Sequence, residues 1–205
     1  MVITRRTFIA ATALTTTVGS FSHAQEDDGK YPMRFASNIE MWWWKLPFID
    51  RINAAADAGF DAIEFWPWRG KDIDAIAKTC KERGVEVAQF TGWGFVPGMN
   101  NPKNHKKFVA EIIEGCKVAK KLNCKRMTVV GGNDQTGMTQ SEMHEHIIEA
   151  LRLVKPIVEQ EEIMLIIEPM NIRVDHKGHC LYGSPDAVRI CREVDSPMVK
   201  INWDL

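Results

Sequence analysis

A regular alternation of short apolar runs with longer amphipathic stretches most constrains what this chain can fold into. The amphipathic stretches carry apolar residues three and four positions apart, which predicts helices. The expected strands are Arg34–Ile39, Ala62–Trp66, Val85–Thr91, Arg126–Gly131, Ile163–Glu168 and Val199–Asp204. The expected helices are Pro47–Ala58, Ile73–Arg83, Lys103–Leu122, Gln140–Glu161 and Pro185–Val194. Alternating strands and helices imply an α/β fold with parallel strands and right-handed crossovers.

Two parallel architectures fit this alternation, an open doubly wound sheet and a (β/α)8 TIM barrel. The open sheet usually carries a glycine-rich phosphate loop after its first strand. Here the first strand runs into N-I-E-M-W-W-W, without that motif. Gly92, Gly94 and Gly98 after the third strand have a different spacing and are interpreted as loop flexibility, and Gly131-Gly132 is no stronger a signal. The barrel is therefore favoured.

The number of strands departs from that architecture. A complete barrel has eight strands and about 250 residues, whereas this chain has 205 residues and only about six β/α units. We therefore expect a partial barrel domain over residues 33–205, a C-terminally truncated form without strands seven and eight. A six-stranded open sheet as the natural product is the alternative.

The N-terminal residues 1–24 have the features of a cleavable signal peptide. Arg5 and Arg6 precede a moderately apolar stretch that is too short to span a bilayer, and small residues before Gln25 suit a signal peptidase. The string T-R-R-T-F-I resembles a twin-arginine signal, whose machinery exports folded proteins. We expect a periplasmic protein with a flexible linker at 25–32 and no stable membrane anchor after cleavage. A plain secretory signal or an uncleaved anchor is the alternative.

The bulk composition limits the partners of the chain. A net charge of −1 with 45% hydrophobic residues is typical of a soluble globular protein. It argues against nucleic acid as a partner, because phosphate binding needs a basic surface. The five cysteines are scattered without a C-x-x-C pair, so neither a zinc ribbon nor a disulfide scaffold is indicated. Most are expected to be small buried residues, and homo-oligomer formation is left open.

Polar residues at the carboxyl ends of the expected strands are the candidate site, because catalytic groups of parallel barrels lie there. They are Glu64, Gln89, Thr91, Asn133, Asp134, Glu168, Asn171 and Asp204. A carboxylate that closes an apolar strand is costly to bury unless it is paired or binds a cation. Glu168 and Asp204 close neighbouring strands, which suggests a shared Mg²⁺ or Mn²⁺ ion. Ion pairs with Lys200 or Arg173 are the alternative.

Two segments carry a resemblance to a known family. The segment I-I-E-P-M-N-I-R-V-D-H-K-G-H-C-L at 166–181, followed by M-V-K-I-N-W-D-L at 198–205, resembles hydroxypyruvate isomerases of the xylose-isomerase-like barrel superfamily. The segments R-F-A-S-N-I-E-M, G-F-D-A-I-E-F-W and V-V-G-G-N are similar to the same family. The likeness covers most of residues 33–205.

The resemblance implies interconversion of hydroxypyruvate and tartronate semialdehyde, or of a similar small sugar acid. Glu168 and Asp204 would bind a divalent metal that stabilises an enediolate, and Glu168 would also move the proton between neighbouring carbons. The family adds a polar ligand after strand seven and a glutamate on strand eight, and neither position exists in this sequence. Family members also often have a histidine near the position of Gln89.

Four residues are candidates for substrate binding: Glu64, Asn171, His176 and Trp43. Glu64 would orient substrate by hydrogen bonding, with a structural ion pair as the alternative. The family places polar substrate contacts in the loop of His176, whereas His179 is expected to be a solvent-exposed loop residue. Trp43 would wall the pocket or pack on a neighbouring loop or subunit.

Three other functions remain open from the sequence. A ketose 3-epimerase or an inosose dehydratase-like enzyme would share the metal frame and differ in its substrate loops. A non-catalytic sugar-binding barrel or an inactive fragment would need no chemistry. A barrel endonuclease acting at abasic DNA sites would need three metals and a histidine-rich site, and the strand ends lack those histidines.

Overall fold

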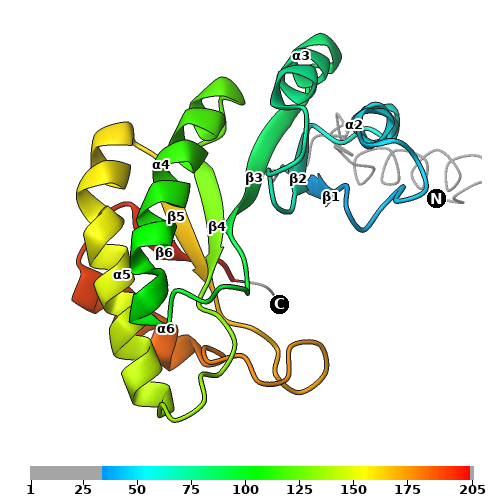
Figure 1. The fold of residues 1–205 in the computed structure, drawn as a ribbon. Coiled ribbons are helices and arrows are strands. Elements are labelled where there is room, and N and C mark those ends of the chain that lie inside the picture. The colour runs from blue at the N-terminus through cyan, green and yellow to red at the C-terminus, as the bar shows by residue number, and fades with distance from the viewer. Residues whose placement is uncertain (1–33, 204–205) are drawn as a thin grey trace, which may run out of the picture. The chain divides into compact units, whose positions relative to one another are not determined.

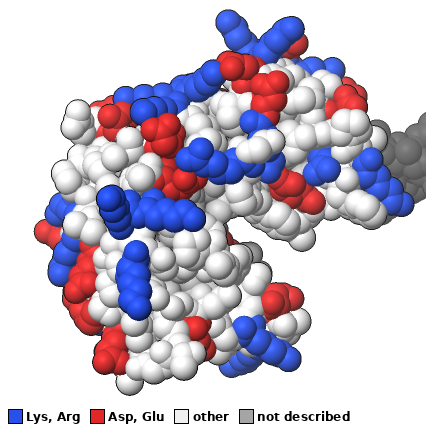
Figure 2. All heavy atoms as spheres, viewed as in Figure 1, with Lys and Arg blue, Asp and Glu red and all other residues white. Residues whose placement is uncertain are grey.

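The computed structural model describes residues 34–203, and its folded unit begins at Phe35. The expected signal peptide, the linker and Asp204 lie outside the described residues. Of the helices that are described, none is both long and apolar enough to cross a bilayer. The face of the molecule in Figure 2 carries basic and acidic side chains interspersed with one another, without a broad area of one sign.

Six parallel strands form one sheet in the order in which they follow along the chain, so the prediction of a parallel α/β fold is confirmed (Figure 1). The strands are β1 (Ala36–Asn38), β2 (Ala62–Phe65), β3 (Glu86–Trp93), β4 (Arg126–Val130), β5 (Met164–Glu168) and β6 (Val199–Ile201). Sequential order without a reversal is the topology of a barrel wall, whereas a doubly wound sheet reverses direction at a switch point. The fold is therefore a partial TIM-type barrel.

An α-helix connects each of the five successive strand pairs, and the helix ends follow from local chemistry. The helices are α2 (Phe48–Asp57), α3 (Ile73–Arg83), α4 (His105–Lys121), α5 (Gln140–Glu161) and α6 (Ser184–Val194). Thr139 and Glu142 form a capping box at the start of α5. Gly84 ends α3 with a φ of 65°, a conformation that glycine adopts without strain.

One helix begins later than the sequence predicts, in the connection from β3 to β4. The expected start was Lys103, but Pro102–Asn104 forms a short 3-10 turn, η1, before α4 begins. The side chain of Asn101 accepts a hydrogen bond from the backbone N–H of Lys103 at 3.1 Å. This side-chain contact competes with the helical backbone pattern and tightens the first turn.

The two faces of the sheet have different surroundings. On one face, Phe65 stacks on Phe90 with ring centroids 5.6 Å apart and meets Phe48 of α2 at 5.7 Å. Ile63 is fully buried on the same face, so this face packs against the helices. Because side chains alternate along a strand, Glu64 and Gln89 project to the opposite face, called the inner face below.

Four of the five cysteines are buried and all five are free thiols, which confirms the prediction of small buried residues. Burial raises the pKa of Cys80, Cys116 and Cys124 to about 11 and the pKa of Cys180 to about 12. Burial also raises the pKa of the half-buried Cys191. All five thiols are therefore protonated at neutral pH, and thiols react as nucleophiles only in the thiolate form.

Candidate functional site

A chain of hydrogen bonds crosses the inner face from β1 to β4. The carboxylate of Glu64 accepts a bond from the Asn38 side-chain amide at 3.1 Å and another from the Gln89 amide at 2.5 Å. The Thr128 hydroxyl donates to the carbonyl oxygen of the Gln89 side chain at 2.6 Å. The four residues, Asn38, Glu64, Gln89 and Thr128, are called the polar ladder below.

The register of the strands places these four side chains in one row. Asn38 lies directly opposite Glu64 in the pairing of β1 with β2. A register shift between Ile63 and Glu64 brings Gln89, rather than Ala88, opposite Glu64. A bulge of this kind re-aims a side chain that regular pairing would turn away. Glu64 therefore has a hydrogen-bonded partner on each side, instead of the ion pair that the sequence left open.

Glu168 ends β5 on the same edge of the sheet, two strands beyond Gln89. It lies opposite Val130 and follows three buried apolar residues of its strand. Its side chain is half-buried and alternation places it on the inner face. Its partner in the predicted cation site, Asp204, lies outside the described residues, so the pairing of these two acids stays a prediction.

The described residues provide only part of a metal centre. Within residues 34–203, no group of three or more His, Cys, Asp or Glu side chains is close enough to hold a metal ion. Glu168 supplies oxygen ligands at the predicted strand end, and oxygen ligands suit Mg²⁺ and Mn²⁺. The donor chemistry fits such an ion, with Asp204 as its second predicted ligand.

Three loops at the carboxyl edge are bonded to one another, and they are called the joined loops below: residues 98–101, 131–135 and 176–181. Asn100 is fully buried, and its side-chain amide donates to the backbone carbonyl of Asn133 at 2.8 Å. The backbone N–H of Asn100 donates to Gly131 at 3.1 Å, and that of Cys180 donates to Gly132 at 3.1 Å. The middle loop, which follows β4, is thus held from both sides.

Gly98 and Gly132 permit this close approach, so the interpretation of Gly98 as a flexible loop residue is corrected to a packing role. A Cβ atom on Gly132 would lie 2.5 Å from the Cα atom of Gly98. Gly132 also has a φ of 120°, a backbone conformation that side chains disfavour. Sequence spacing alone does not distinguish such a packing glycine from a flexible one.

His179 is a structural residue of the joined loops, so the prediction of solvent exposure is wrong. Only 1% of its surface is exposed, and its Nε2 atom accepts a hydrogen bond from the backbone N–H of Gly132 at 3.2 Å. Its Nδ1 atom donates to the carbonyl oxygen of Leu181 at 2.8 Å. Burial lowers the pKa of His179, which agrees with a neutral ring that donates on one side and accepts on the other.

His176 and Asn171 lie in the loop after β5. The His176 ring stacks on the ring of Phe95, which lies in the loop that follows β3, with ring centroids 4.9 Å apart. The side-chain oxygen of Asn171 accepts bonds from the backbone N–H groups of Arg173 and Val174 at 3.0 and 3.3 Å. Asn171 thus shapes its own turn. Substrate binding by these residues stays a prediction.

Trp43 lies in an aromatic group after β1. Its ring centroid is 5.6 Å from that of Trp42 and 6.4 Å from that of Phe60. It packs partly buried against the core, while Trp42 and Trp44 are 55% and 63% exposed. The contact with Phe60 matches the packing alternative for Trp43, and a role in walling a substrate pocket stays a prediction.

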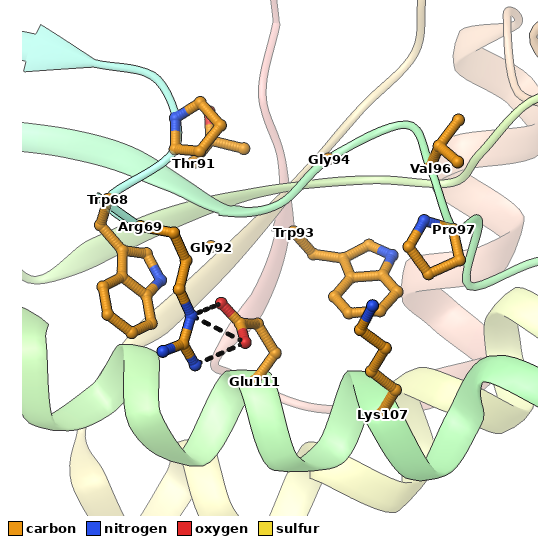
Figure 3. Close-up of a pocket in the computed structure, with 11 residues that line it drawn as sticks. Trp68, Arg69, Thr91, Gly92, Trp93, Gly94, Val96, Pro97, Lys107 and Glu111 are labelled. Carbon is orange, nitrogen blue, oxygen red and sulfur yellow. Dashed lines mark hydrogen bonds and ion pairs between the residues drawn. The ribbon is translucent and has the colours of Figure 1, made fainter. Parts of the chain in front are cut away.

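A separate cavity of about 320 Å³ lies between the loop after β2, the end of β3 and α4 (Figure 3). Arg69 makes a two-pronged contact with Glu111, with its closest nitrogen at 2.8 Å, and stacks over Trp68 at 4.0 Å. Trp93 and Lys107 line the other end. Of the candidate site residues that the structure describes, Thr91 is the one that lines this cavity, and the sequence pattern did not predict a pocket here.

Comparison with known proteins decides the family. Residues 52–205 match the xylose isomerase-like TIM barrel family. The chain belongs to this family. The hydroxypyruvate isomerase of Escherichia coli is a distant homologue, 24% identical over 184 residues that cover 84% of this chain and 69% of the relative. The 2-oxo-tetronate isomerase of Pectobacterium atrosepticum is 26% identical over 83% of this chain and 67% of its own length.

A solved structure supports the same fold for this xylose isomerase-like chain. The crystal structure described as AP endonuclease, family 2, from Brucella melitensis superimposes with a TM-score of 0.72. It is 24% identical and covers 84% of this chain and 68% of that one. At this identity the likeness shows the barrel fold alone. The two isomerase relatives, together with the family match, place the chain in a sugar isomerase and epimerase superfamily.

Sequence reasoning missed several residues that organise this edge. Asn38 and Thr128 were not among the candidate site residues. Each lies on the inner face and bonds to a candidate, Asn38 to Glu64 and Thr128 to Gln89. A polar residue inside an apolar strand, as in R-M-T-V-V, was the available signal for Thr128. Asn100 gave no such signal, because its role depends on a loop that lies 33 residues further along the chain.

Proposed function

We propose that this protein is a metal-dependent isomerase that interconverts hydroxypyruvate and tartronate semialdehyde. The observation that carries the proposal is Glu168, a half-buried carboxylate that closes the apolar strand β5 at the carboxyl edge of the barrel wall. Catalytic groups of parallel barrels lie at this end of the strands, and carboxylate oxygens suit a divalent ion. The isomerase homologues give the reaction class.

The proposed chemistry moves one proton between two carbons. Glu168 takes a proton from C3 of hydroxypyruvate and returns it to C2, while the hydroxyl proton on O3 is lost and O2 gains a proton. Glu168 and Asp204 would together hold the divalent ion, which supplies positive charge against the negative charge of the enediolate. Glu64, held by Asn38 and Gln89, would orient the substrate.

A substrate panel tests the reaction. The metal-loaded protein should convert hydroxypyruvate faster than 2-oxotetronate, and both faster than a ketohexose. The order between the two acids separates this proposal from a 2-oxo-tetronate isomerase activity, the activity named for the Pectobacterium relative. Faster turnover of the ketohexose would favour a 3-epimerase, and dehydration of an inosose would favour a dehydratase-like enzyme.

Metal content tests the cation site separately from turnover. Elemental analysis should find bound Mn²⁺ in the Mn²⁺-loaded wild type and a strong loss in Glu168→Gln and in Asp204→Asn. Glu82→Gln, on the exposed surface of α3, is the control and should keep the metal. Unchanged metal in both site variants would refute the cation site. Metal binding without turnover of any panel member would favour a non-catalytic sugar-binding barrel.

We further propose that residues 1–24 direct twin-arginine export to the periplasm. The support is the paired Arg5 and Arg6 before a moderately apolar stretch. Replacement of both arginines by lysine should keep the protein in the cytoplasmic fraction, because the twin-arginine machinery reads the arginine pair. Export of the lysine variant at the wild-type level would contradict this route.

A further inference from the structure

The polar ladder fixes which atoms of its two amides face Glu64. The side-chain oxygen of Asn38 accepts a hydrogen bond from the backbone N–H of Glu40 at 3.0 Å. A backbone N–H only donates, so the Asn38 amide must turn its NH₂ group toward Glu64. On the other side, the Gln89 NH₂ group donates to Glu64, and the Gln89 oxygen accepts a bond from the Thr128 hydroxyl.

Each oxygen of Glu64 therefore receives one amide N–H bond, and both bonds suit the ionised carboxylate. An ionised carboxylate has about four lone-pair positions, so two acceptor positions remain after the ladder bonds are made. Glu64 is half-buried on the inner face, at the same edge as Glu168. Both oxygens of Glu64 are thus pre-oriented hydrogen-bond acceptors.

The position of Glu64 separates it from the proposed cation site. β2 and β5 are three strand spacings apart in the sheet order, each about 4.8 Å. Glu64 and Glu168 thus lie on different parts of the barrel wall and would meet different sides of a small substrate. A carboxylate that only accepts attracts a hydroxyl group and repels a second anion such as a phosphate.

We propose that Glu64 accepts a hydrogen bond from a substrate hydroxyl group, and that Gln89 and Thr128 are positioning residues that make this contact selective. The site would then prefer an unphosphorylated hydroxy-keto acid to the same acid without its hydroxyl. This inference rests on the proposed function, because it takes the substrate class from it.

Binding of hydroxypyruvate and of pyruvate, which lacks the hydroxyl, tests the inference without requiring turnover. Calorimetric titration of the metal-loaded wild type should give a dissociation constant at least about tenfold lower for hydroxypyruvate, the expected effect of one hydrogen bond to a charged group. Gln89→Leu should reduce this preference to less than about threefold and leave the affinity for pyruvate unchanged. 3-Phosphohydroxypyruvate should bind more weakly than hydroxypyruvate to the wild type.

Matched variants separate positioning from a general loss of structure. Thr128→Val keeps the side-chain shape and removes only the donor to Gln89, so it should lower the preference less than Gln89→Leu. Gln89→His keeps an N–H donor, so it should retain part of the preference for hydroxypyruvate that Gln89→Leu loses. Glu82→Gln, on the exposed surface of α3, is the control and should leave the preference unchanged, and thermal melting checks that each variant folds.

The outcomes distinguish this inference from the isomerase proposal. An unchanged preference in folded Gln89→Leu overturns the inference, even if the wild type isomerises hydroxypyruvate. A wild type that binds hydroxypyruvate and pyruvate equally also overturns it. If the preference for hydroxypyruvate depends on Gln89 but the protein has no isomerase activity, the inference is supported and the proposed reaction is refuted.

Discussion

The joined loops, which follow β3, β4 and β5, and the segment after β1 form opposite kinds of surface at the carboxyl edge of the sheet. In the joined loops, the polar residues Asn100 and His179 are 0% and 1% exposed because they bond to the backbone of adjacent loops. After β1, the apolar residues Trp42 and Trp44 are 55% and 63% exposed. Hydrogen-bond satisfaction, rather than side-chain polarity, thus decides what is buried here. The joined loops provide a fixed frame beside Glu168.

Gly132→Ala should break this frame most strongly. The new methyl group would meet the backbone of Gly98, and the positive φ adds strain, so we expect a loss of about 3 kcal/mol in the free energy of unfolding. Gly137→Ala is the matched control, with a φ of 82° and no atom within 4 Å of the new carbon. It should lose only about 1 kcal/mol in urea denaturation. Equal losses would show that backbone conformation alone matters.

Asn100→Ala should have the next largest effect. It removes the donor to the buried carbonyl of Asn133 and the acceptor for Gln135, at an expected loss of about 2 kcal/mol. Asn101→Ala removes two bonds of a more exposed side chain, one to the same Gln135 and one from the backbone N–H of Lys103, and should lose about 1 kcal/mol. If both variants lost the same free energy of unfolding, burial of the Asn100 amide would add no stability to the joined loops.

Acidification should weaken the joined loops through His179. Burial lowers its pKa in the folded protein, so the unfolded state binds the proton first as the pH falls through the ordinary value. The free energy of unfolding should therefore fall between pH 7 and pH 5, by at most about 1.4 kcal/mol per pH unit for this one proton. His179→Gln should be less stable at pH 7 but show a flatter pH dependence. Parallel curves would exclude His179 as the source.

Substitution of an exposed tryptophan in the segment after β1 should change the free energy of unfolding least. Trp44→Ser removes an exposed ring, while the backbone carbonyl of Trp44 that binds Arg51 remains. We expect a change below about 0.5 kcal/mol in the free energy of unfolding. A loss comparable with that of Asn100→Ala would show that the exposed tryptophans stabilise the fold and would remove the contrast between the two regions.

The helices and strands could be predicted because their signals are local. The start and end of α5 at Gln140 and Glu161 agree with the expected range, since apolar spacing and the cap at Thr139 both lie within the segment. The start of α4 could not be predicted from the sequence, because the side chain of Asn101 and the ring of Pro102 form a tighter turn before it. Periodicity does not report such a competing local bond.

The candidate site was predictable only in its strand-end acids. Glu64 and Glu168 stand out in the sequence as carboxylates within apolar strands, and the structure places both on the inner face. The partners of Glu64 depend on the shift of register beside Ile63, which brings Gln89 opposite it. The burial of His179 depends on Gly132, in a loop 47 positions earlier. Contacts between distant segments leave no periodic mark in a single sequence.

The enclosed thiols make the fold indifferent to the redox state of its surroundings. Cys80, Cys116, Cys124 and Cys180 are each at most 6% exposed, so an oxidant in solution reaches little of their sulfur surface. Burial also raises the pKa of each of these thiols, so little of the thiolate that attacks a disulfide is present at neutral pH. The same chain therefore suits both a reducing and an oxidising environment, and Cys191 is the most accessible of its cysteines.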